Sequence, residues 1–305
     1  MPSTASTVRD YYYAHFGALP QDKQFHFVSR LGSWNNDTQA LDKLEALRPT
    51  FATPDIKGDL RRLIAHPPTA KINAIERRAP YFAKYPQLRG YMLALFRVRH
   101  LLFHYDIDAR DILLDIVAKD ELYTLSDALQ NDHEAVATLS TYAINYIYLV
   151  EMILFPSNDR PLHSFLADVL ALAATYDDTP EDSLLLIYLF THCIIGASNF
   201  YQSKVSLENT PEYRTMLEII ETRIAAHFTA INLDNKFEFL VCCRLTDFTT
   251  NLDGRIQRET EQSYSPNGTF LIDTVNTAGQ SNKTSFADSE HRNVLYIMSQ
   301  TKLLK

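Results

Sequence analysis

The stretch that decides the fold runs from Thr179 to Tyr201 and reads TPEDSLLLIYLFTHCIIGASNFY. It opens with a threonine at a capping position, a proline at the first helical position and two acids in the first turn, which is typical of a helix start. The residues that follow are apolar on nearly every side of a helix, so protein must surround this helix. We therefore predict an all-α fold whose centre lies in the second half of the chain.

Similar start signals recur along the chain. Thr-Pro followed by an acid stands at 53–55 and at 210–212, and residues 7–10 (Thr-Val-Arg-Asp) read as a capping box. Between the signals the apolar spacing is helical, and most prolines fall between the expected helices. Pro80 is the exception and is expected to end or kink its helix. The expected helices are 7–16, 22–31, 38–47, 54–65, 70–84, 87–104, 108–130 with a break near Asp120, 133–155, 162–176, 180–201, 211–231, 235–249 and 290–302.

Residues 251–289 interrupt this helical pattern. They include a β-branched stretch at 269–275, which is typical of a short strand, and a long polar run. We expect an irregular loop there. The remaining helices are expected to form antiparallel hairpins, arranged either as an α/α toroid or as a compact α-solenoid. Residues 1–105 are expected to form an amphipathic outer layer and residues 106–305 the core domain, unless the two make one continuous domain.

Composition narrows the class of partner. The 305 residues carry a formal net charge of -8, which disfavours nucleic acid as a partner. Eight glycines against 17 Phe and 17 Tyr argue against a glycine-loop nucleotide binder. No apolar stretch reaches the ~20 residues that a membrane-spanning helix needs. Three cysteines, two of them adjacent, make a poor disulfide framework, so we expect a cytoplasmic protein.

The apolar helix at 180–201 carries the first candidate site. His192, Gly196 and Asn199 stand at i, i+4 and i+7 and share one face. Buried polar side chains there need hydrogen-bond partners, which either the core or a ligand can supply. We predict His192 as a catalytic acid or base, with Asn199 and Tyr188 as ligand-binding residues; a core histidine with satisfied hydrogen bonds is the alternative.

Residues 191–200 (Thr-His-Cys-Ile-Ile-Gly-Ala-Ser-Asn-Phe) resemble a segment of an uncharacterised family of bacterial all-helical proteins. That family has a Thr-His start, a Thr-Asp-Phe end and a second histidine on a late helix, a position that His291 matches. This chain departs from the pattern at Ile195, Gly196 and Asn199. The resemblance implies a helical architecture and a site built from His192 and His291, and it implies no activity.

No cofactor is expected, and zinc is the weaker alternative. Cys193, Cys242 and His291 are ligand types that zinc prefers, and in outline they resemble the Cys/Cys/His zinc site of the toroidal lanthionine cyclases. Those enzymes carry Cys-His-Gly, whereas this chain has His192-Cys193 in the reverse order. Adjacent cysteines on a helix point about 100° apart, so Cys242 and Cys243 are poorly placed to share one ion.

Two acids in apolar helices complete the set of candidates. Glu151 and Asp247 are expected to line the pocket, because an acid in apolar surroundings either shifts its pKa or finds a cation. Together these residues predict a ligand- or peptide-handling protein, with an enzyme of bacterial peptide or natural-product metabolism as one form of it. Its partner would be a peptide, a small molecule or a protein. A non-catalytic interaction scaffold of the α-solenoid type is the alternative.

Overall fold

We analysed a computed structural model of the chain, which describes residues 4–68, 76–155, 163–272 and 284–304. These residues form seventeen α-helices, α1 to α17, joined by turns and short 3₁₀ segments. An isolated antiparallel bridge between Tyr264 and Leu271 is the only β-pairing among them. The predicted all-α fold is therefore confirmed.

The chain divides into two compact units, and α3 (Thr38–Ala46) crosses the boundary between them. Unit 1 comprises Met1–Leu44 and Asp177–Lys305, and unit 2 comprises Glu45–Tyr176. The division expected near residue 105 thus falls inside unit 2. Local amphipathicity could not show this, because α1 and α2 bury their apolar faces against α17, far along the chain.

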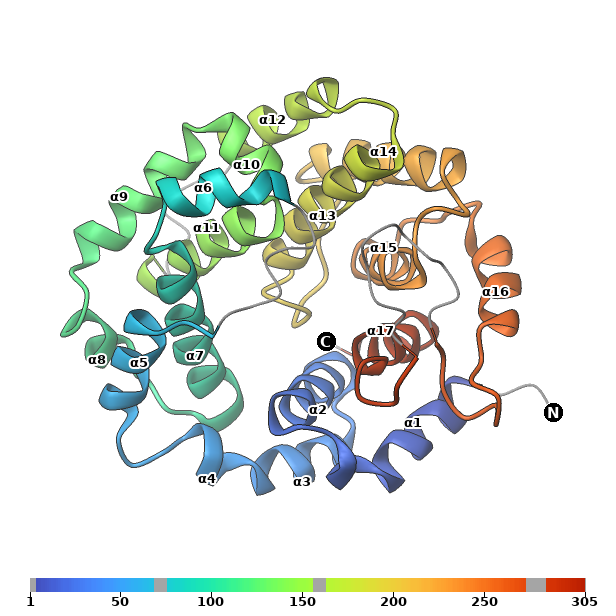
Figure 1. Cartoon of the computed structure of the whole chain (residues 1–305), viewed down its shortest axis with the longest axis horizontal. Helices are drawn as coiled ribbons and strands as arrows, with labels where there is room; N and C mark the ends of the chain where they lie inside the picture. Colours follow the sequence, from blue (N-terminus) through green and yellow to red (C-terminus); the bar gives the residue numbers. More distant parts are fainter. Residues whose placement is uncertain (1–3, 69–75, 156–162, 273–283, 305) are drawn as a thin grey trace. The chain divides into compact units, whose positions relative to one another are not determined.

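Unit 1 is built around four helices that follow one another in space: α13, α15, α17 and α2 (Figure 1). Each packs against the next, while α1 covers α17, α14 covers α13 and α15, and α16 covers α15. Because the central helices come from both ends of the chain, polar residues distant in sequence meet in this unit. Its helices are α1 (Ala5–Ala14), α2 (Gln21–Asn35), α13 (Pro180–Ala197), α14 (Glu212–Ala226), α15 (Leu233–Thr246), α16 (Asp253–Gln262) and α17 (Glu290–Gln300).

Unit 2 centres on α11, which packs between α7 and α9. Helix α7 also packs on α5, and Gly90 allows the close approach: a Cβ at Gly90 would lie 2.5 Å from the carbonyl oxygen of Ile64. The helices of this unit are α4 (Arg48–Phe51), α5 (Ile56–Ala65), α6 (Ala79–Lys84), α7 (Leu88–Tyr105), α8 (Arg110–Leu114), α9 (Lys119–Gln130), α10 (His133–Leu139), α11 (Thr141–Leu154) and α12 (His163–Ala171).

The helix expected at 133–155 is two helices, because the chain turns sharply at Ser140. Ser140 is fully buried and has a φ of 45°, a value that only a strongly supported non-glycine residue adopts. Arg78 provides support: its Nη2 donates to the Ser140 hydroxyl over 2.8 Å and its Nε donates to the Thr138 carbonyl over 3.1 Å. A partner 62 residues away in sequence therefore stabilises the break.

Several helix boundaries differ from the predictions. Helix α1 starts one turn earlier than the capping box at 7–10 implied, with Thr4 as its cap. Helix α16 lies inside the stretch expected to be irregular, and residues 273–283 of that stretch lie outside the described part. Pro80 stands in the first turn of α6, where its missing N–H costs nothing. The start at Thr179 is confirmed: its hydroxyl accepts the Asp182 N–H over 3.2 Å.

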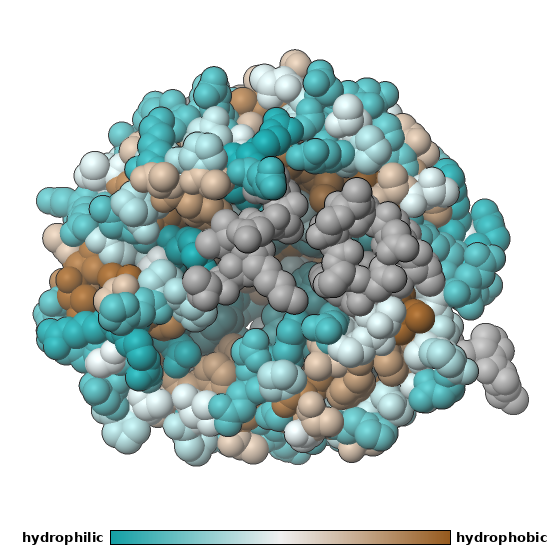
Figure 2. Space-filling view, viewed as in Figure 1, coloured by the Kyte–Doolittle hydropathy of each residue, from teal (hydrophilic) through white to brown (hydrophobic). Residues whose placement is uncertain are grey.

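Among the described helices, none alone is long and apolar enough to cross a membrane. The bent pair α10 and α11, with 109° between them, passes the same test of length and composition when taken together. The face shown in Figure 2 is mainly hydrophilic, and its apolar residues form small separate patches. Large apolar side chains exposed among the described residues are Leu41, Phe103 and Leu304.

Candidate functional site

The core of unit 1 contains a group of ionisable side chains that we call the charged cluster. It is assembled from four helices, and most of its members are buried or partly buried. Its members are Lys23, His26 and Arg30 on α2, His192 on α13, Asp234 and Glu238 on α15, and Glu290, His291 and Arg292 on α17.

The first pair in the charged cluster is His26 with Glu290. The Nδ1 of His26 lies 2.7 Å from Oε1 of Glu290, whose side chain is 0% exposed. Burial raises the pKa of Glu290 to about 8, although the charges of Lys23 and Arg30 oppose this rise. Burial, together with the same two cations, lowers the pKa of His26 well below its ordinary value. Both groups are therefore largely uncharged near neutral pH, with the acid proton of Glu290 donated to Nδ1.

The second pair, His192 with Glu238, has the opposite character. The Nε2 of His192 lies 3.1 Å from Oε1 of Glu238, which also accepts the Thr191 hydroxyl over 3.0 Å. Burial alone would raise the pKa of Glu238. His192, Arg30 and the Thr191 hydroxyl outweigh burial and hold the pKa below its usual value. Glu238 is therefore a buried carboxylate that stays ionised.

Arg30 acts on both pairs. Its positive charge lowers the pKa of Glu238, of Glu290 and of His26, which places the guanidinium near all three. Its Nη1 is buried and makes no hydrogen bond with any described residue. A buried donor without a partner costs about 1–3 kcal/mol, and a water, an ion or a ligand is the usual source of the missing acceptor.

A strained turn at the end of α13 places an aromatic ring against Arg30. Asn199, Phe200 and Tyr201 have φ values of 55°, 53° and 73°, in the left-handed region that costs each L-residue roughly 1–2 kcal/mol. Ser198 stabilises this turn, because its hydroxyl donates to the Ile195 carbonyl and accepts the Tyr201 N–H. As a result the Tyr201 ring lies 4.9 Å from the Arg30 guanidinium.

A third ion pair anchors the charged cluster within the core. Arg292 is fully buried, and its Nε lies 3.0 Å from Oδ1 of Asp234. This pair joins α15 to α17 and leaves neither charge alone in the interior, which would be strongly destabilising. We interpret the Arg292–Asp234 pair as a structural contact that fixes α15 and α17, and therefore Glu238 and Glu290, relative to each other.

The charged cluster holds two imidazoles against different partners, the protonated Glu290 and the ionised Glu238. It also contains Arg30, which has one N–H donor that no described residue uses. The side chains of His26 and His192 are 31% and 15% exposed, whereas their glutamate partners are 0% and 5% exposed. A buried carboxyl group that orients a partly exposed imidazole is the usual arrangement of a histidine that transfers protons. The Nε2 of His26 makes no hydrogen bond within the described residues and is available to a ligand.

The structure places four of the predicted site residues in this part of unit 1. His192 belongs to the charged cluster through Glu238, and the ring of His291 lies 5.3 Å from that of His26. Asn199 stands in the strained turn rather than on the helix, which ends at Ala197, so the expected i, i+7 relation to His192 is wrong. Tyr188 lies on α13 one turn before His192 and is partly buried.

Two predicted residues lie elsewhere. Asp247 is 80% exposed and pairs with Lys204, because α15 ends at Thr246 and Asp247 turns outward with a φ of 55°. It therefore does not line a buried pocket. Glu151 belongs to α11 in unit 2 and is not a member of the charged cluster.

The cysteines do not form the zinc site considered from the sequence. In the described residues, no group of three or more His, Cys, Asp or Glu side chains is arranged to hold a metal ion. Cys193, Cys242 and Cys243 are free and buried. Burial raises the pKa of all three thiols.

Sequence reasoning missed His26, Arg30, Glu238 and Glu290, although a signal for some of them is present. His26 and Arg30 are four residues apart on α2, as are Asp234 and Glu238 on α15, so each pair shares one helix face. Such a charged pair in a largely apolar helix predicts a polar interior surface. These surfaces meet through tertiary packing, which no local sequence pattern predicts.

Searches of protein-family models, of curated proteins and of solved structures found no match to this chain.

Proposed function

We propose that the charged cluster of unit 1 binds the carboxylate of a small ligand or short peptide, and that His26 and His192 are its acid–base groups. The observation that carries this proposal is the buried Nη1 of Arg30, which lacks a partner among the described residues. A guanidinium is the side chain best suited to a carboxylate, because its donors match both oxygens. The C-terminus of a peptide supplies such a group.

Proton transfer is the chemistry that this site is equipped for. With Glu290 protonated, His26 carries its own proton on Nε2, and a proton donated from that atom is replaced from Glu290 through Nδ1. Such a pair releases and takes up protons near neutral pH, as a general acid needs. No metal or organic cofactor takes part in this proposal. The free thiols are compatible with the cytoplasmic location that we also propose.

The test is a calorimetric titration with trialanine and with trialanine amide, which lacks the terminal carboxylate. We expect trialanine to bind at least tenfold more tightly than the amide, and Arg30→Met to remove that preference. Arg9→Met is the matched control, because Arg9 lies on α1 and pairs with Asp10 outside the charged cluster. Absence of trialanine binding, equal binding of the two peptides, or an unchanged preference in Arg30→Met would overturn the proposal.

The second candidate is a non-catalytic scaffold of the α-solenoid type, in which the ion pairs only join helices. The fully buried Arg292–Asp234 pair favours this role, because it connects α15 and α17 without facing solvent. His192→Ala separates the two. A scaffold predicts lost thermal stability with unchanged ligand binding, whereas a binding site predicts a retained fold with lost binding of trialanine.

A further inference from the structure

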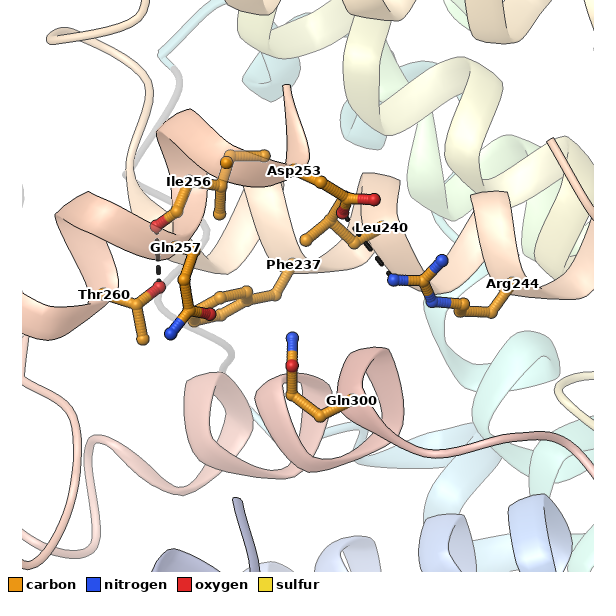
Figure 3. A pocket seen from close by; sticks show the side chains of 9 residues that line it. Phe237, Leu240, Arg244, Asp253, Ile256, Gln257, Thr260 and Gln300 are labelled. Atoms are coloured by element: carbon orange, nitrogen blue, oxygen red, sulfur yellow. Dashed lines mark hydrogen bonds and ion pairs between the residues drawn. The ribbon is translucent and has the colours of Figure 1, made fainter. Parts of the chain in front are cut away.

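A second site lies on another face of α15. Phe237, Leu240 and Arg244 stand at i, i+3 and i+7 and share a face that is distinct from the one carrying Asp234 and Glu238. Together with α16 and the end of α17, this face encloses a cavity of about 240 Å³ (Figure 3). Its lining residues are Phe237, Leu240, Arg244, Asp253, Gly254, Ile256, Gln257, Thr260 and Gln300.

The cavity has one apolar wall and one charged end. Phe237, Leu240 and Ile256 form the wall and are themselves almost fully buried. Arg244 and Asp253 lie together at one end (Figure 3), and their side chains are 39% and 46% exposed. A ligand can therefore enter from solvent and reach both charges.

The two charges are only partly used by the protein. The Nη2 of Arg244 lies 3.7 Å from Oδ1 of Asp253, which is too long for a hydrogen bond. The Nε of Arg244 donates to the Ser299 carbonyl over 3.0 Å, so the guanidinium is fixed in direction while its outer nitrogens keep their donors. Gln257 and Gln300 flank the same space with amide groups (Figure 3).

We propose that this cavity binds a free α-amino acid with an apolar side chain. Arg244 would take the α-carboxylate and Asp253 the α-ammonium, because the two protein charges are opposite and adjacent, as the two ligand charges are. The apolar wall would take the side chain. The volume lies below the ~300–1,000 Å³ of pockets for drug-sized ligands, which favours a ligand of this size.

The test uses L-leucine as the probe, with N-acetylleucine and leucine amide as analogues that each lack one charge. We expect leucine to bind the full-length protein in calorimetric titration, and each analogue to bind at least tenfold more weakly. Because the analogues are compared on the unchanged protein, this part does not depend on any variant folding. No detectable leucine binding at millimolar concentration, or equal binding of leucine and both analogues, overturns the proposal.

Variants then locate the site. Arg244→Met and Asp253→Asn are each expected to weaken leucine binding at least tenfold. Arg214→Met, an exposed arginine on α14, is the matched control and should bind leucine as the unchanged protein does. Arg30→Met separates this site from the charged cluster: loss of leucine binding in Arg30→Met with normal binding in Arg244→Met would place the amino acid elsewhere and overturn the assignment.

Discussion

The charge state of Glu290 can be tested through the pH dependence of stability. The pKa of Glu290 rises from an ordinary value of 4.5 to about 8 on folding, mainly through burial. Between these values the native state keeps the proton that the unfolded chain has lost, so the contribution of Glu290 to stability is largest at low pH and falls as pH rises. The full shift of 3.5 pKa values corresponds to about 5 kcal/mol, at about 1.4 kcal/mol each. In the native state half of Glu290 is still protonated at pH 8, so the dependence ends above about pH 9.

Glu290→Gln removes this titration while keeping an amide that can donate to Nδ1 of His26. The free energy of unfolding of the variant, minus that of the unchanged protein, should therefore rise by about 1.6 kcal/mol between pH 6.5 and 8. His26 is uncharged in both proteins over this window, because its lowered pKa matters only in more acidic solution. A constant loss from the missing Lys23 contact would lower the whole curve and leave its slope intact.

Urea denaturation at pH 6.5, 7, 7.5 and 8 measures the slope. Glu218→Gln is the control, because Glu218 lies on the exposed face of α14, outside the charged cluster. A flat curve for Glu290→Gln would refute the reasoning. It would mean that Glu290 is ionised in the folded protein and that His26 carries the proton, so that the pair is an ion pair at neutral pH.

Three further predictions concern packing, backbone and thiols. Gly90→Ala should destabilise the protein by about 1–3 kcal/mol in urea denaturation, because the added methyl meets the Ile64 backbone; an unchanged midpoint would contradict the close approach. Ser198→Ala should cost about 1–3 kcal/mol by releasing the left-handed turn, and the circular-dichroism melting curve would show the loss. The three buried cysteines should resist a thiol reagent at pH 8 in the folded protein and react in denaturant, whereas a rapid reaction under native conditions would contradict their burial.

Local rules accounted for the helices and for some of their ends. The Thr179 cap was predictable because capping depends on a few adjacent residues and on their chemistry. The same reasoning failed at Ser140, where the break depends on Arg78, a residue 62 positions away. It failed again after Ala197, because nothing in the spacing of Asn199 or Tyr201 announces a left-handed turn supported by a serine hydroxyl.

The residues of the candidate site also divide into those that local rules predict and those that depend on tertiary packing. His192 was predictable from a polar residue in an apolar helix, and its partner Glu238 could have been, since it has the same character on α15. The face that His26 and Arg30 share was visible in their spacing, but its burial was not, because α2 carries ordinary surface residues as well and only packing on α17 buries this face. Asp247 shows the converse error, because the sequence predicted it to line the pocket. It lies one residue beyond the end of the buried helix α15, and its side chain is in solvent.

The two carboxylates of the charged cluster illustrate why environment rather than residue type assigns roles. Both are buried, both hold an imidazole, and both lie within the influence of Arg30. Glu238 also accepts a hydroxyl and stays ionised, whereas Glu290 has the longer contact of 3.6 Å with Nζ of Lys23 and keeps its proton near neutrality. Groups whose environments separate their pKa values in this way can serve as a proton donor and as a charge stabiliser in one site.

A carboxylate ligand bound by Arg30 would add a negative charge beside Glu290 and raise the pKa of that acid further. Binding of such a ligand above pH 8 should therefore be accompanied by proton uptake, which calorimetry in buffers of different ionisation enthalpy measures directly. Binding without proton uptake would show that the ligand does not bind beside Glu290.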